Sequence, residues 1–353
     1  MTRLTSENLF FPLAAAHGAV SVGIWAILPP DGITVAWHVH ELAYGYAAGV
    51  IAGFLLTRAS RLELAVAVVV WLAARCLWIL PDVSEAARAA ASLVGTGVIV
   101  LLASRGFLRA VKRGQNAVFP IVLVAFWIGD AALQAAILLV EPAAEQAAGR
   151  AAVMLVVLLV VVMGGRIAGA ALSGLAQRSG LPRIAPQPQL ERVLVAALTA
   201  VAVGLATDLP YMLVPASWIA AGAIAVRLVG WAPGLRLAGP DLLSLVASQG
   251  FVALGLAGVG VAVLQSPWPE STPLHLVTIG GIGIATVAMM LKTRAQRARL
   301  SPPARTIGAA TALLALSAVV RVLGQGEPGI AYPVAGIAWI AAMTLGLVAL
   351  LRR

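Results

Sequence analysis

The sequence predicts an all-α membrane protein that crosses the bilayer twelve times, with both termini in the cytoplasm. Of its 353 residues, 61% are hydrophobic and only 11% are charged. Soluble proteins carry about 25% charged residues, so this composition excludes a soluble globular protein. The apolar residues also occur in long runs, and a transmembrane helix needs about 20 of them.

The charge and the cysteine content exclude further classes of protein. The formal net charge is +10, which in a soluble chain would indicate a nucleic-acid partner. Here the basic residues lie between apolar runs, so we expect a lipid bilayer and no nucleic acid as the partner. Cys76 is the single cysteine, which excludes an intramolecular disulfide and metal sites that need a pair of cysteines.

Apolar runs bounded by charges or by Pro and Gly predict the helices in order. They lie approximately at residues 9–28, 36–57, 62–80, 87–104, 117–140, 145–165, 192–209, 213–232, 242–264, 273–291, 306–323 and 330–350. A cytoplasmic linker over about 166–191 contains LPRIAPQPQL, whose prolines cannot continue a helix. We therefore expect one transmembrane domain with helices 1–6 over about 9–165 and helices 7–12 over about 192–350.

The distribution of basic residues supports this count and orientation. Most of the 24 Lys and Arg residues fall in segments that are cytoplasmic if both termini are inside. The positive-inside rule describes this excess of basic residues on the cytoplasmic side. With one span more or fewer, the basic segments would fall on both sides of the membrane.

Histidines in the second and tenth spans predict a metal centre, most simply a haem. His38 and His40 lie at the outer end of the second span, and His275 lies at nearly the same depth in the tenth. Two helices thus place imidazoles at the same depth, as a haem whose iron is bound by a histidine on each side requires. His38 and His40 point about 200° apart on a helix, so only one of them can bind the iron. The alternative is that these are interfacial histidines hydrogen-bonded to their neighbours.

Two arginines near the outer ends of their spans are predicted partners for the haem propionates. Most basic residues are predicted on the cytoplasmic side, but Arg75 and Arg321 lie near the outer side. A carboxylate partner would explain why a cation is tolerated at this position. The alternative is that both side chains extend to the outer headgroups. Glu41 can orient an imidazole through its second ring nitrogen or pair with Arg75.

Other polar residues lie deeper in the predicted spans. His17, near the middle of the first span, is either a second metal ligand or a packing histidine. Asp130 lies near the centre of the fifth span, with Gln134 one turn later on the same face. Intramembrane carboxylates often mark proton or ion pathways, so this pair is a candidate proton path. A protonated Asp130 hydrogen-bonded across helices is the structural alternative.

The sequence resembles the NnrS family of twelve-helix bacterial membrane proteins, which are linked to nitric oxide stress and denitrification. Three strings of residues carry the resemblance: Trp37-His38-Val39-His40-Glu41 with Gly45 and Val50 to Thr57, Met163-Gly164-Gly165-Arg166, and Leu274-His275-Leu276 with Thr278, Gly280, Gly283, Met289 and Met290. Together they extend over nearly the whole chain. The helix pairing also resembles the low-spin haem site of haem–copper oxidase core subunits, in architecture only.

The resemblance implies haem b, with His38 or His40 and His275 as iron ligands, in a bacterial inner membrane. It also implies copper, but the chain has four histidines and does not supply three clustered imidazoles. We expect a haem protein of nitric oxide physiology that transfers electrons or binds a diatomic gas, with a quinol or another redox partner. The alternatives are a quinol-linked nitric oxide reductase and a proton-coupled transporter that uses Asp130.

Overall fold

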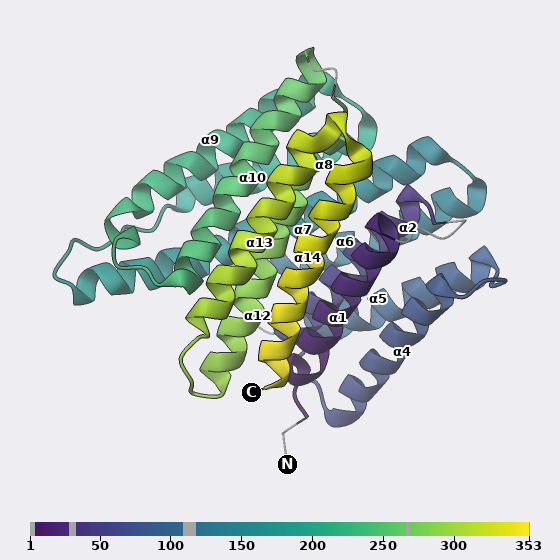
Figure 1. Cartoon of the computed structure of the whole chain (residues 1–353), viewed down its shortest axis with the longest axis horizontal. Helices are drawn as coiled ribbons and strands as arrows, with labels where there is room; N and C mark the ends of the chain where they lie inside the picture. The colour runs from purple at the N-terminus through teal and green to yellow at the C-terminus, as the bar shows by residue number, and fades with distance from the viewer. Residues whose placement is uncertain (1–3, 28–32, 109–117, 266–267, 353) are drawn as a thin grey trace. The chain divides into compact units, whose positions relative to one another are not determined.

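A computed structural model describes residues 4–27, 33–108, 118–265 and 268–352, and all regular structure in these segments is helical (Figure 1). The chain divides into two compact units. Unit 1 comprises Met1–Leu155 with Leu350–Arg352, and unit 2 comprises Val156–Ala349. The boundary between the units falls within the helix Pro142–Arg178.

Unit 1 contains the first predicted spans. Its helices are α1 (Ser6–Ala26), α2 (Val35–His40), the π-helix η1 (Glu41–Ala47), α3 (Ala48–Leu55), α4 (Arg61–Ile79), α5 (Glu85–Leu108) and α6 (Val118–Leu139). α2, η1 and α3 follow one another without a break, so Val35–Leu55 is one helical run that matches the predicted second span. α1 packs on η1 and α3, and α5 packs on both α4 and α6.

α7 (Pro142–Arg178) is longer than the sequence predicts. The predicted helix ends at residue 165, but IAGAALSGLA after Arg166 contains nothing that breaks a helix, and it continues to Arg178. Gly180 then takes a φ of +72°, and the Leu181 N–H donates to the Ala176 carbonyl at 2.9 Å. This is a common way for a helix to end. The connection that contains the prolines is therefore shorter than the predicted linker.

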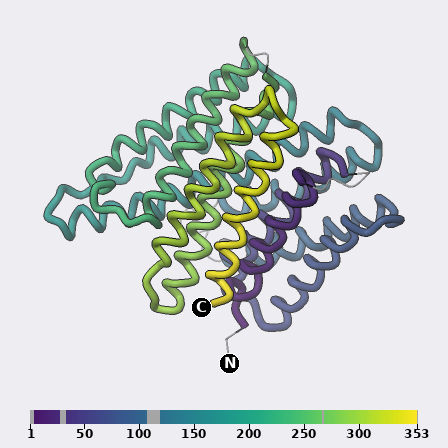
Figure 2. Tube along the Cα trace, viewed as in Figure 1, coloured from purple at the N-terminus to yellow at the C-terminus, as the bar shows by residue number. Residues whose placement is uncertain are grey.

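Unit 2 contains the remaining spans, whose trace can be followed in Figure 2. They are α8 (Pro188–Thr207), α9 (Pro210–Leu235), α10 (Pro240–Gln265), α11 (Ser271–His275), the π-helix η3 (Leu276–Gly283), α12 (Ile284–Arg297), α13 (Ala304–Leu323) and α14 (Pro328–Leu351), with a short 3₁₀ turn η4 (Gly324–Gly326). α8 and α9 both begin at a proline, which is suited to the first helical position. α9 packs on α8 and α10, and α10 packs on η3.

The prediction of an all-α multi-pass membrane protein is confirmed. Among the described residues, 11 helices are long and apolar enough to cross a membrane by length and composition. The second of the twelve predicted spans is not among these 11 helices. The helical run Val35–Leu55 covers it. The predicted ends at residues 28 and 117 lie outside the described residues.

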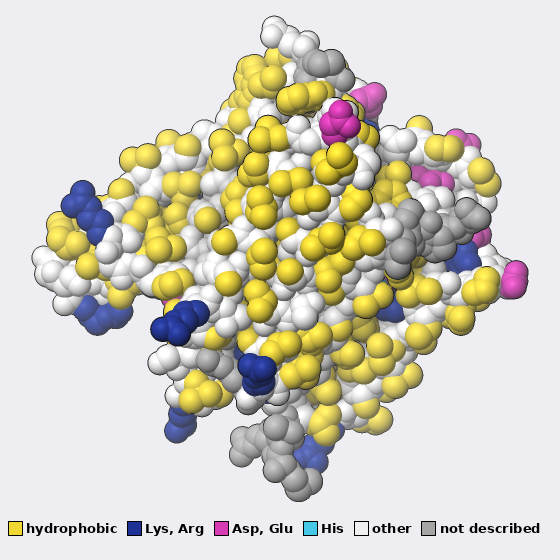
Figure 3. Space-filling view, in the orientation of Figure 1, with side chains coloured by type: hydrophobic (Ala, Val, Ile, Leu, Met, Phe, Trp, Pro, Cys, Tyr) yellow, Lys and Arg dark blue, Asp and Glu magenta, His cyan; other side chains and the backbone are white. Residues whose placement is uncertain are grey.

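Large apolar side chains face outward along these helices. In α13 and α14, Leu323, Ile330 and Ile337 are 72%, 68% and 57% exposed. Figure 3 shows hydrophobic side chains over the visible face of these two helices. Such a surface would be unstable in water and is suited to the hydrocarbon core of a bilayer.

Small residues let the helices of unit 2 approach closely. A Cβ added to Gly255 in α10 would lie 2.9 Å from the Pro273 carbonyl oxygen and 3.0 Å from the Val277 nitrogen. Because these are backbone atoms of α11 and η3, they cannot move aside as a side chain can. Gly255 thus fixes how closely α10 approaches the helix that carries His275.

Gly255→Ala is expected to destabilise the protein by about 1–3 kcal/mol, because it forces a methyl group into a filled contact. Gly250→Ala in the same helix is the matched control, since a Cβ there meets nothing within 4 Å. Thermal unfolding in detergent measures both variants. Equal midpoints would contradict the close approach of α10 to η3.

Candidate functional site

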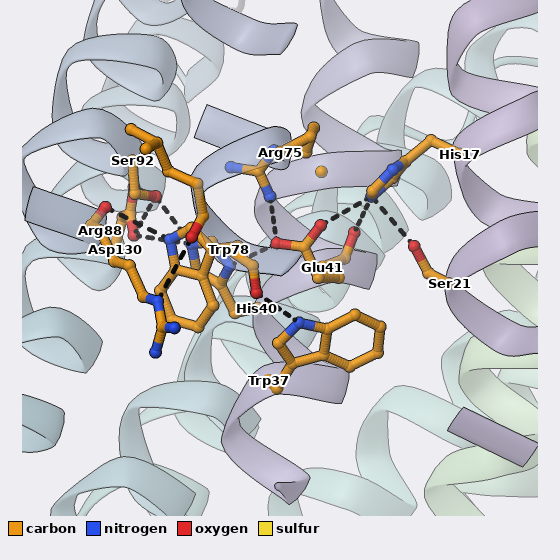
Figure 4. A network of polar contacts seen from close by, with 12 residues as sticks. His17, Ser21, Trp37, His40, Glu41, Arg75, Trp78, Arg88, Ser92 and Asp130 are labelled. Atoms are coloured by element: carbon orange, nitrogen blue, oxygen red, sulfur yellow. Dashed lines mark hydrogen bonds and ion pairs between the residues drawn. The ribbon is translucent and has the colours of Figure 1, made fainter. Parts of the chain in front are cut away.

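Unit 1 contains a buried polar network centred on Glu41, the first residue of η1 (Figure 4). The Glu41 side chain is fully buried, and its Oε1 lies 2.6 Å from Nη1 of Arg75 in α4. A Cβ at Gly45, one turn along η1, would lie 3.1 Å from the same Nη1. Glycine at this position therefore provides the space into which Arg75 reaches.

His17 from α1 contacts the other side of Glu41. Its Nε2 is 3.1 Å from Glu41 Oε2, 3.2 Å from the Glu41 carbonyl oxygen and 3.1 Å from Ser21 Oγ. A Cβ at Gly45 would clash with this nitrogen. The Glu41 carbonyl oxygen can only accept, so Nε2 carries the hydrogen and donates it there. Glu41 Oε2 has no hydrogen-bond partner among the described residues. His17 is thus a polar partner of Glu41.

His40 connects Glu41 to α5. Its Nδ1 lies 2.9 Å from Glu41 Oε1, and its Nε2 lies 2.7 Å from Ser92 Oγ. The ring is fully buried and stacks on Trp78 with ring centroids 3.6 Å apart. Trp78 is itself held by the Trp37 indole, which donates to its carbonyl at 3.1 Å. Both ring nitrogens of His40 therefore have polar partners.

Asp130 in α6 ends the network on the far side of Ser92. The Ser92 hydroxyl lies 2.9 and 3.1 Å from the two carboxyl oxygens of Asp130. Gln134 donates from Nε2 to Asp130 Oδ1 at 3.0 Å, as expected for residues one turn apart. Asp130 is fully buried, and His40 Nε2 lies 3.8 Å from its Oδ1.

These contacts permit two arrangements of hydrogens. Glu41 Oε1 also accepts from Arg75, so His40 Nδ1 donates to Glu41 in both arrangements. In one, a doubly protonated His40 donates to Ser92, which donates to an ionised Asp130. In the other, a protonated Asp130 donates to Ser92, which donates to a neutral His40. Moving two hydrogens across Ser92 converts one into the other, so this serine is suited to pass a proton.

The predicted ligand His275 lies in unit 2 at the end of α11. Its Nδ1 donates to the Ser271 carbonyl at 2.7 Å, which leaves Nε2 with its lone pair. Arg321 in α13 is close enough for its charge to act on this ring. The Arg321 guanidinium lies 3.7 Å from the centre of the Tyr332 ring, and its Nη1 is buried without a hydrogen-bond partner among the described residues.

Two of the three candidate iron ligands directly precede a π-helix. His40 is the last residue before η1, and His275 is the last residue before η3. π-helical turns are rare and occur frequently at functional sites. His38, by contrast, lies two residues earlier, within α2, and stacks on Trp25 with ring centroids 4.7 Å apart.

The structure brings most of the sequence candidates into two groups. Unit 1 joins His17, Glu41, His40, Arg75, Asp130 and Gln134, and unit 2 places Arg321 near His275. Sequence reasoning missed Ser92 and Trp78, which resemble ordinary residues of an apolar helix. The position of Gly45 could have been noticed in the sequence, because it follows Glu41 by four residues and so lies on the same face of the helix. In the described part of the chain, no three His, Cys, Asp or Glu side chains group to hold a metal ion.

Arg75→Met is expected to destabilise the protein by about 3–5 kcal/mol, since it leaves the Glu41 carboxylate buried without its cation. Arg105→Met is the control, because Arg105 and Glu63 form an ion pair of similar length, 2.7 Å, that is exposed. Exposed pairs contribute little. Thermal unfolding in detergent should show a large loss for the first variant and almost none for the second. Similar losses would show that the burial of the Glu41 pair does not matter.

Three comparisons with known proteins were made. The family model described as NnrS protein matches residues 8–352, which is nearly the whole chain. A search of curated proteins and a search of solved structures each found no match. The family match supports a membrane protein of the nitric oxide response. From the extent of this match, the chain belongs to the NnrS family.

Proposed function

We propose that the chain is a haem-binding protein of the bacterial inner membrane that acts in nitric oxide physiology by electron transfer or gas binding. The observation that carries the haem proposal is the environment of His275. This imidazole is oriented by a backbone carbonyl, precedes a π-helix and has an arginine with an orphaned nitrogen nearby. Membership of the NnrS family supports the link to nitric oxide.

His275 has the features of a metal-ligating histidine. Such residues usually donate their second ring N–H to a carboxylate or a backbone carbonyl, which fixes the tautomer and the ring orientation. The Ser271 carbonyl has this position at 2.7 Å from Nδ1. Nε2 would then bind the iron of a haem b.

Arg321 is suited to pair with a haem propionate. Its Nη1 is buried and lacks a hydrogen-bond partner among the described residues, and leaving such a group unpaired costs free energy. A carboxylate would satisfy it with a charge-assisted hydrogen bond. Arg75, the other predicted propionate partner, already has Glu41 at 2.6 Å.

The second iron ligand predicted from the sequence, His38 or His40, stays a prediction. For His40 to bind iron through Nε2, Ser92 would have to leave that nitrogen, to which it lies at 2.7 Å. Because Ser92 also connects His40 to Asp130, ligation would divide the network. When bound, the haem would supply an iron that exchanges electrons or binds a diatomic gas. Copper, a quinol partner and nitric oxide reductase activity also stay predictions.

A proton-coupled transporter is a second candidate, favoured by the position of Asp130. Its carboxyl group is fully buried within a membrane span and is joined through Ser92 to His40 and Glu41. Buried intramembrane carboxylates are typical of proton relays in transporters. This alternative requires no haem, so the absorption of the purified protein distinguishes the two.

The purified protein is expected to show a haem Soret band and, after reduction with dithionite, sharp α and β bands. His275→Ala should lose or convert this spectrum, and added imidazole should restore it in part by replacing the missing ligand. His17→Gln is the control, because glutamine keeps a donor to Glu41 and should leave the bands unchanged.

Two outcomes would contradict the proposal. A colourless wild-type preparation from cells supplied with haem precursor would favour the transporter. A haem spectrum in His275→Ala identical to that of the wild type would remove this residue as a ligand.

A further inference from the structure

Unit 2 contains a cavity of about 310 Å³ between the end of α7, the start of α10 and α12. Pockets that hold small ligands have volumes of about 300–1,000 Å³. Ala170, Gly174 and Arg178 line it from α7, Asp241 and Leu242 from α10, and Lys292 from α12. The first three are four residues apart and therefore share one face of α7.

The charges around this cavity do not cancel. Lys292 is largely buried, and its Nζ lies 2.6 Å from Asp241 Oδ2, so this pair is neutral. The Arg178 side chain has no hydrogen bond or ion pair with any other residue in the described segments. The cavity thus carries one uncompensated positive charge, and the first turn of α10 adds the positive end of its helix dipole.

The shape of the cavity depends on small residues beside the cation. A Cβ at Gly174 would lie 3.3 Å from Arg178 Nη1, so a larger side chain would crowd the guanidinium and fill the space. Apolar side chains of Leu175 and Leu237 also line it. The site therefore combines an anion-binding group with an apolar wall.

We propose that this cavity binds a phosphate group, either that of an acidic phospholipid or a free phosphate ion. Arginine binds phosphate oxygens through paired hydrogen bonds, and Lys292 has two further donors beside Asp241. Arg178 and Lys292 both lie in or beside segments that the positive-inside rule assigns to the cytoplasmic side. Basic pockets between helices on that side bind acidic headgroups. The proposal does not depend on haem binding.

The test measures thermal unfolding of the delipidated full-length protein in detergent. Phosphatidylglycerol, phosphatidylcholine with the same acyl chains and inorganic phosphate are each titrated. Phosphatidylglycerol is expected to raise the midpoint and phosphatidylcholine to leave it unchanged. Arg178→Gln should weaken the apparent affinity about tenfold or more, because it removes a charged hydrogen-bond donor.

Two further variants separate a specific site from a general effect of charge. Gly174→Leu keeps every charge but fills the cavity, so it should also weaken binding. Arg236→Gln removes an exposed cation in the connection before α10 that does not line the cavity, and it should bind as the wild type does.

The outcomes also identify the source of the phosphate. Stabilisation by phosphatidylglycerol alone that is lost in Arg178→Gln identifies the lipid, and the same pattern with inorganic phosphate identifies the free ion. The proposal is overturned if neither stabilises the protein, or if Arg178→Gln and Arg236→Gln reduce binding equally.

Discussion

The ion pair between Glu41 and Arg75 is the interaction on which the structure of unit 1 depends. A carboxylate enclosed by helices loses its hydration, and only close cations and hydrogen-bond donors offset that cost. Glu41 has Arg75 at 2.6 Å, His40 at 2.9 Å and His17 at 3.1 Å. Arg75 comes from α4 and His17 from α1, whereas His40 belongs to the same helical run as Glu41, so one side chain fixes how α1 and α4 meet this run.

This constraint also explains local features of η1. The π-helix begins at Glu41, and Gly45 lies where any Cβ would clash with His17. The network then continues from His40 through Ser92 to Asp130 and so reaches α5 and α6. A polar line inside an apolar bundle costs stability, and proteins retain such groups mainly where they have a function. In unit 2, the polar residues enclosed among apolar helices that we assign a function are His275 and Arg321.

The sequence was sufficient to predict the fold class and the approximate place of each span, because apolar runs and basic connections report directly on the membrane. It also identified Glu41, Arg75 and Asp130, since an ionisable residue in an apolar run is conspicuous. It left open whether Glu41 pairs with Arg75 or orients an imidazole, and the structure shows both contacts. Ser92 could not be predicted, because helical periodicity gives the face on which a residue lies but not which helix packs against that face.

The most direct measurement of the role of Glu41 and Arg75 is a double-mutant cycle of unfolding stability. It compares Glu41→Gln, Arg75→Met and the double variant in the same detergent. Glutamine keeps one oxygen that can accept from His40, and the backbone carbonyl still accepts from His17, but the buried charge is removed. The account predicts that the double variant is more stable than Arg75→Met alone, because no unpaired carboxylate remains. Additive losses in the double variant would contradict it.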